Sequence, residues 1–94
     1  MFFNNAPAKF SLGRVVATPH VLKMVPQAEI TAALNRHLKG DWGVMPEEDR
    51  EANELALKGG DRIFSAYHSR TGVKFWIITE WDRSATTILL PEEY

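Results

Sequence analysis

The chain has 94 residues, which is enough for one compact domain and too few for two. Hydrophobic residues make up 45% of the sequence and charged residues 24%, a globular composition that excludes a disordered or collagen-like chain. There is no cysteine, which excludes disulfides, thiolate metal sites and thiol nucleophiles, and the net charge is only −1.

Apolar runs and the first residues indicate where the chain resides. No run approaches the ~18 apolar residues of a membrane span. Residues 1–5 lack the basic and then apolar pattern of a signal peptide. We therefore expect a cytoplasmic protein with no membrane partner. We also expect a single domain over residues 1–94, in which residues 1–9 form a loosely ordered N-terminal segment.

The first elements are a strand and a short helix. Residues Leu12 to Ala17 predict the strand, with β-branched residues at its centre. Thr18 and Pro19 predict a helix start, because threonine caps free amides and proline has its φ already set. Pro26 cannot continue this helix, so the helix ends before it.

Two further helices follow, and the sequence marks them unequally. The second carries a complete apolar stripe at helical spacing, made of Ile30, Ala33, Leu34, His37 and Leu38. On this stripe we expect His37 to be a hydrogen-bonded core residue rather than a ligand. The third runs from about Pro46 to Lys58, with acids in its first turn and a thin apolar stripe, so we expect it to pack peripherally.

Three strands complete the chain, at Arg62–His68, Val73–Glu80 and Ala85–Leu90. Their connections are short enough to require antiparallel hairpins. The predicted fold class is therefore α+β, in the order β-α-α-α-β-β-β, with a C-terminal three-stranded antiparallel meander packed against helices.

Loop lengths predict the strand register. A four-residue loop over residues 69–72 places His68 opposite Val73, and the second turn places Ile77 opposite Ile88. The face expected to cover the core then collects Phe64, Ala66, Val73, Phe75, Ile77, Ile88 and Leu90. The opposite face collects Ile63, Ser65, Tyr67, Lys74, Trp76, Ile78, Thr87 and Leu89.

The opposite face is too apolar to be left in water, because the solvated face of an antiparallel sheet is normally polar. A helix, the N-terminal segment or a second copy of the chain must cover it. If a second copy covers it, the interface residues are Ile63, Tyr67, Trp76, Ile78 and Leu89. Trp81, in a turn where nothing requires burial, is a further predicted interface residue.

No motif indicates catalysis, a metal site or a cofactor, and none of these is predicted. One polar set could support acid–base chemistry on a phosphodiester: His68 and Arg70 near one end of the hairpins, and Glu80, Asp82 and Arg83 near the other. The predicted register separates the two groups by roughly 20 Å. We therefore favour structural roles for these residues and a protein that is not an enzyme.

Charge leaves nucleic-acid binding as a weaker alternative. Residues 1–43 carry five bases and two acids, whereas residues 44–94 carry six bases and ten acids. The first two predicted helices could expose Asn35, Arg36 and Lys39 to DNA, but the first helix is short and the basic half is weakly charged. The same asymmetry suits head-to-tail self-association.

A family resemblance covers most of the chain from Phe10 onward, in the segments Phe10–Pro19, Gly40–Gly43, Asn53–Leu57, Trp76–Glu80, Asp82–Ser84 and Thr86–Pro91. These segments resemble a small bacterial family whose members are described as plasmid-related, phage-related or hypothetical. The resemblance implies a mobile-element setting and supplies no activity, ligand or catalytic residue. Trp81 departs from the smaller residue expected at that position.

We therefore predict a non-enzymatic accessory or interaction protein of a mobile genetic element, which forms a homodimer and can also meet an unidentified protein partner. Two alternatives stay open. The strand order is similar to that of RelE/ParE-type toxins, so a toxin ribonuclease using His68, Arg70 or Arg83 is one, although this is an analogy of fold only. A nucleic-acid-binding regulator is the other.

Overall fold

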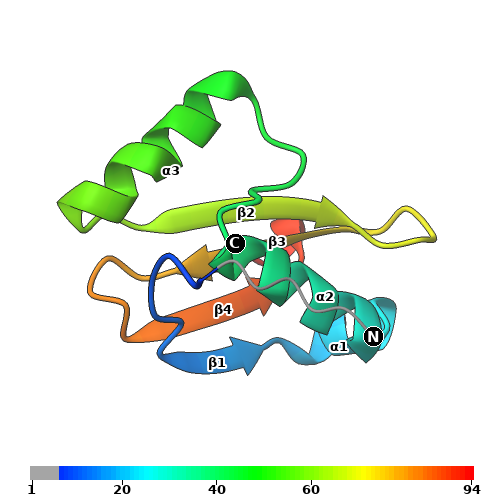
Figure 1. The fold of residues 1–94 in the computed structure, drawn as a ribbon. Coiled ribbons are helices and arrows are strands. Elements are labelled where there is room, and N and C mark those ends of the chain that lie inside the picture. The colour runs from blue at the N-terminus through cyan, green and yellow to red at the C-terminus, as the bar shows by residue number, and fades with distance from the viewer. Residues whose placement is uncertain (1–6) are drawn as a thin grey trace.

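The elements follow one another in the predicted order, and the α+β fold class is confirmed (Figure 1). The computed structural model describes residues 7–94. Its elements are β1 (Arg14–Ala17), α1 (Pro19–Met24), α2 (Gln27–Leu38), α3 (Glu47–Gly59), β2 (Ile63–His68), β3 (Lys74–Thr79), β4 (Ala85–Leu89) and the 3₁₀ turn η1 (Pro91–Glu93). Of the segment predicted over residues 1–9, residues 1–6 lie outside the described part of the chain.

The helix boundaries have local causes that the sequence already carries. The Thr18 hydroxyl accepts a hydrogen bond from the Val21 N–H at 3.2 Å, and Pro19 occupies the first helical position of α1. Gly60 caps the C-terminus of α3 with a φ of +77°, a conformation that glycine adopts without a steric cost. None of the helices within residues 7–94 combines the length and apolar character needed to cross a bilayer.

The four strands form one sheet in the order β1-β4-β3-β2. Strands β2, β3 and β4 make the predicted antiparallel meander, with Ile77 opposite Ile88 as expected. Strand β1 pairs with β4 in parallel, Val15 lying opposite Thr86. The first and last strands of the chain are therefore neighbours, and β1 and β2 are the two edges of the sheet.

The predicted register between β2 and β3 is wrong by one residue. His68 lies opposite Lys74 rather than Val73, because the Ser69 N–H donates to the Val73 carbonyl at 2.8 Å and closes a three-residue loop. Gly72 ends that loop with a φ of +89°, as expected for a three-residue hairpin loop. Because the loop has three residues instead of four, the register shifts by one, and every side chain of β2 turns to the other face of the sheet.

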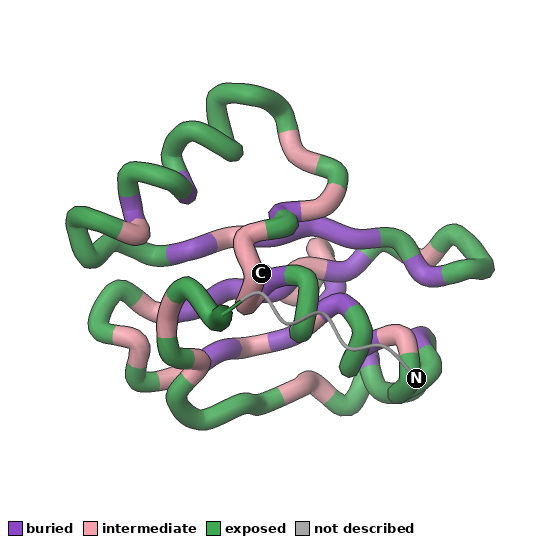
Figure 2. The backbone as a smooth tube through the Cα atoms, in the orientation of Figure 1, coloured by how far each residue is buried: buried purple, intermediate pink, exposed green. Residues whose placement is uncertain are grey.

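As a result, the inner face of the sheet differs from the expected one only on β2. Ile63, Ser65 and Tyr67 point into the core, and Phe64 and Ala66 point to the outer face. Helices α1 and α2 cover the inner face through a cluster of buried side chains. Buried residues, purple in Figure 2, recur along β2, β3 and β4. The members of that cluster are Val21, Val25, Ile30, Ala33, Tyr67, Phe75, Ile77, Ile88 and Leu90.

The chain also covers much of its own outer face. Helix α3, peripheral as predicted, lies along the β2 edge of the sheet, where its Ala56 packs with Ile63 and Trp42 (Figure 1). From the other side the C-terminal turn brings the Tyr94 ring to 5.7 Å from the Trp76 ring, edge to face. Ile78 and Leu89 are also buried on this face, at 3% and 7% exposure. Among residues 7–94, the C-terminal turn is therefore the segment that packs on this face, which none of the three predicted covers included.

Candidate interaction surfaces

Four of the six predicted interface residues lie inside the protomer. Ile63, Tyr67, Ile78 and Leu89 are all buried, the first two because the register shift turned them into the core. Tyr67 also donates its hydroxyl to the Asp41 carbonyl at 2.6 Å. The assignment of these four side chains to a surface is therefore corrected.

The other two predicted interface residues are accessible. Trp81 is 63% exposed in the turn between β3 and β4. Trp76 is half-buried on the outer face, where its ring centroid lies 4.7 Å from that of Phe64. A partner could reach these two tryptophans, although they lie on different parts of the molecule.

The residues of the toxin alternative are not brought together. The pair His68–Lys74 lies at one end of the β2–β3 ladder and the pair Ile63–Thr79 at the other, so Arg70 and Arg83 belong to opposite ends. The Arg83 guanidinium is occupied by backbone, donating to the carbonyls of Ala56, Asp61, Glu80 and Trp81. Arg83 therefore joins the end of α3 to the β3–β4 turn, which is a structural role.

His37 is a buried hydrogen-bonded histidine, as predicted. Its Nδ1 lies 2.5 Å from the Ser65 hydroxyl and its Nε2 lies 2.9 Å from the Thr79 hydroxyl. Thr79 in turn contacts the Thr86 hydroxyl at 2.7 Å, so one polar chain links α2 to three strands. Burial lowers the pKa of His37 to about 3, so the ring is neutral at ordinary pH. Within residues 7–94 no group of His, Asp and Glu side chains is arranged to hold a metal.

The β2 edge of the sheet is closed by the chain itself. The Ala66 N–H donates to the Trp42 carbonyl at 3.1 Å, and the Ala66 carbonyl accepts from the Val44 N–H at 2.7 Å. Next along the strand, the Asn53 side chain accepts from the Phe64 N–H at 3.0 Å and donates to the Phe64 carbonyl at 2.7 Å. Another strand cannot add to β2 at these positions, because the outward backbone groups are already paired.

The opposite edge, formed by β1, is open. The N–H groups of Arg14 and Thr18 donate into the β4 side, to the Ser84 and Ile88 carbonyls, each at 3.0 Å. Because such bonds alternate along a strand, the backbone groups of Val15 and Ala17 point away from the sheet. In the part of the chain that the structure describes, nothing pairs with them. We call these outward groups, with the side chains of Val15 and Val16, the β1 edge.

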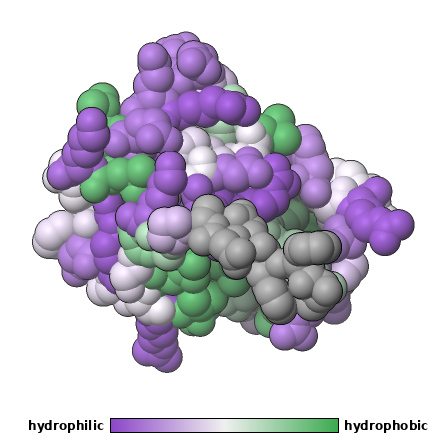
Figure 3. Space-filling model, in the orientation of Figure 1, coloured by the Kyte–Doolittle hydropathy of each residue, from purple (hydrophilic) through white to green (hydrophobic). Residues whose placement is uncertain are grey.

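Exposed apolar side chains are concentrated in β1 and in α1, the helix that follows it along the chain. Eight large hydrophobic side chains are exposed among residues 7–94, and half of them lie in β1 and α1: Val15, Val16, Leu22 and Met24. Figure 3 shows hydrophobic surface in the lower part of the molecule, where β1 and β4 lie in Figure 1. Natural edge strands usually carry lysine, proline or a bulge, and the centre of β1 has none of these.

Sequence reasoning missed this surface. The strand itself was predicted, but nothing in its sequence identifies β4 as its neighbour or shows that its other side is open. The available signal was the pair of adjacent valines without a flanking acid or lysine.

Compared with protein-family models, with curated proteins and with solved structures, the chain matches none of them significantly.

Proposed function

We propose that the protein is a non-enzymatic interaction protein that forms a homodimer through the β1 edge. The observation that carries this proposal is the contrast between the two edges of the sheet. The β2 edge is closed by Trp42, Val44 and Asn53, whereas the β1 edge offers unpaired backbone groups and exposed valines. The mobile-element setting rests on the sequence resemblance alone and belongs to the same proposal.

A second copy is the partner that fits the β1 edge best, because this edge is self-complementary. Two identical strands related by a two-fold axis run antiparallel. With the axis at Val16, each Val15 pairs with Ala17 of the other copy, and about four backbone hydrogen bonds form. The two Val16 side chains then lie directly opposite each other, on the same face of the joined sheet.

Charge supports the same arrangement. In this register each Arg14 lies opposite Thr18 of the other copy, so the arginines do not face each other. Pairing of the two β1 strands also joins both sheets into one continuous sheet, so the backbone groups of β1 are no longer free to pair with other chains. The dimer predicted from the sequence is thus retained in this proposal, with a different interface.

The test is light scattering during gel filtration, which gives the mass of the particle. We expect the wild type to have twice the monomer mass and Val16→Lys to be a monomer, because the substitution places two ammonium groups opposite each other. Leu55→Lys is the matched control: Leu55 is 70% exposed on α3, far along the chain from β1, and this variant stays dimeric. A monomeric wild type, or a dimeric Val16→Lys, contradicts the proposal.

A further inference from the structure

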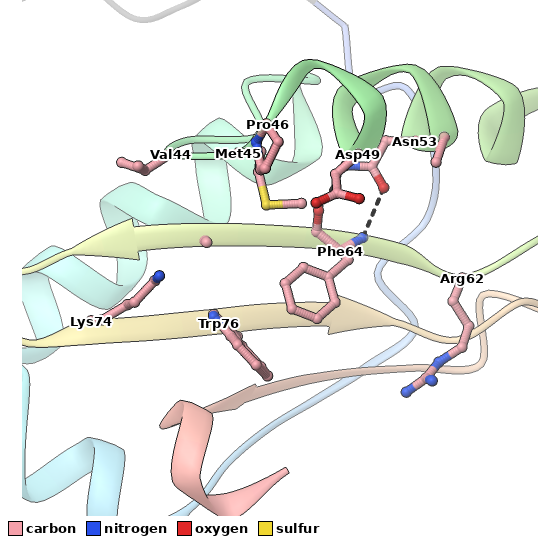
Figure 4. Close-up of a pocket in the computed structure, with 11 residues that line it drawn as sticks. Val44, Met45, Pro46, Asp49, Asn53, Arg62, Phe64, Lys74 and Trp76 are labelled. Carbon is pink, nitrogen blue, oxygen red and sulfur yellow. Dashed lines mark hydrogen bonds between the residues drawn. The ribbon is translucent and has the colours of Figure 1, made fainter.

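A groove with a volume of about 380 Å³ lies between α3 and the outer face of the sheet (Figure 4). We call it the α3 groove. Phe64 and Trp76 form its floor, Asp49 of α3 and Met45 just before α3 form one wall, and Lys74 and Arg62 lie at its two ends. Its volume is in the range of small-molecule sites.

The wall of the α3 groove is held in place by hydrogen bonds rather than by contact with a ligand. Arg50 donates from Nε to the Met45 carbonyl and from Nη2 to the Gly43 carbonyl, each at 3.2 Å. The Asn53 side chain ties the middle of α3 to the backbone of Phe64. The groove is therefore preformed, so a ligand would not have to order it.

The floor is aromatic. The Phe64 and Trp76 rings contact each other with their centroids 4.7 Å apart, and Tyr94 closes the far side of the indole. Phe64 and Trp76 are both only half-buried, so they present apolar ring surface to whatever enters. A planar ring gains dispersion and stacking energy on such a floor.

The charged side chains of the α3 groove differ in whether they have ion-pair or hydrogen-bond partners. Arg62 lies 3.6 Å from the Glu80 carboxylate and donates to the Tyr94 hydroxyl at 2.8 Å. Among residues 7–94 neither Lys74 nor Asp49 has an ion-pair or side-chain hydrogen-bond partner. Figure 4 shows the Lys74 ammonium turned toward the groove from β3, and the Asp49 carboxylate turned toward Phe64 from α3.

From this geometry we propose that the α3 groove binds a small planar aromatic carboxylate. The ring lies on Phe64 and Trp76 beside Met45, the carboxylate pairs with Lys74, and a ring N–H donates to Asp49. A free cation and a free carboxylate on opposite sides of an apolar floor select a ligand with one anionic end and one donor. A nucleic-acid strand fits poorly, because α3 carries acids at Glu47, Glu48, Asp49, Glu51 and Glu54.

The test compares three ligands that share one ring: indole-3-acetate, tryptamine and indole. Calorimetry gives the dissociation constants, and amide chemical shifts locate the site. We expect indole-3-acetate to bind about tenfold more tightly than tryptamine, as for one charge-assisted hydrogen bond, and its shifts to centre on Phe64 and Trp76. Lys74→Gln weakens indole-3-acetate by about tenfold and leaves indole unchanged.

Lys58→Gln, on the last turn of α3, is the matched control and retains full affinity. Asp49→Asn weakens the binding of indole-3-acetate but not that of 1-naphthaleneacetate, which lacks the ring N–H. The proposal is overturned if no ligand binds, if tryptamine binds as tightly as indole-3-acetate, or if Lys74→Gln has no effect. The site does not involve β1, so Val16→Lys binds like the wild type and the outcome is independent of dimer formation.

Discussion

At the scale of single residues, His37 shows how one polar group organises a core. It lies on the apolar stripe of α2 and is fully buried, and the Phe10 and Trp42 rings pack against it. Its two nitrogens contact Ser65 and Thr79, which come from two different strands. Buried polar groups favour one arrangement when every one of them has a partner, and these two hydrogen bonds favour the observed position of α2 over the sheet.

The titration of His37 makes the stability of the fold dependent on pH. Its pKa is about 3 in the folded protein because of burial and about 6.5 when the chain is unfolded. Between these values the unfolded state binds more protons, so the free energy of unfolding rises with pH. As the pH is lowered below 6.5, the free energy of unfolding decreases by about 1.4 kcal/mol per pH unit.

Urea unfolding at pH 7, 6 and 5 measures this slope. His37→Leu removes it, at the cost of lower stability at pH 7, because the Ser65 and Thr79 hydroxyls lose their imidazole partner. The exposed His68 is the control, since His68→Gln keeps the slope. Hydrogen bonds lower the pKa of the Asp41, Asp82 and Glu93 carboxyls below their ordinary 3.8, 3.8 and 4.5, so the contributions of these three groups to the slope come at lower pH. A wild type whose stability is the same at pH 7 and pH 5 contradicts this account.

At the scale of elements, the sequence predicted which helices and strands form and missed how two of them pair. Local signals were sufficient for the helices, since Thr18, Pro19 and Gly60 act on their own neighbours. The β2–β3 register depends on whether Ser69 is part of the loop or pairs with Val73 just beyond the ends of the two strands. One hydrogen bond, from the Ser69 N–H to the Val73 carbonyl, decides this and moves Tyr67 from the outer face into the core.

The attachment of α3 depends on Asn53, a residue that helical periodicity does not single out. Its amide replaces a neighbouring strand by pairing both backbone groups of Phe64. We expect Asn53→Ala to lower the free energy of unfolding by about 2–4 kcal/mol, because two backbone groups lose their partners. Chemical denaturation measures this, with the exposed Asn35→Ala on α2 as the control, which changes stability by less than about 0.5 kcal/mol. Equal stabilities of the two variants would show that Asn53 does not hold α3.

At the scale of the whole molecule, the chain pairs the backbone of one edge strand, β2, with its own residues and leaves the other edge strand, β1, unpaired on its outward side among residues 7–94. On the outer face, which the sequence predicted to be too apolar for water, the C-terminal turn packs against Trp76, and Ile78 and Leu89 are buried within the protomer. What is left open is the β1 edge, with Val15 and Val16 at 44% and 42% exposure. This surface could not be predicted from the sequence, because it depends on the distant pairing of β1 with β4.

The most direct test of the proposed dimer mixes two variants, Val16→Lys and Val16→Glu, and follows the mass by light scattering. Each variant alone is expected to be a monomer, because like charges face each other across the two-fold axis. An equimolar mixture is expected to recover the dimer mass, because position 16 then pairs lysine with glutamate. A mixture that stays monomeric, while the wild type is a dimer, would contradict pairing through β1 in this register.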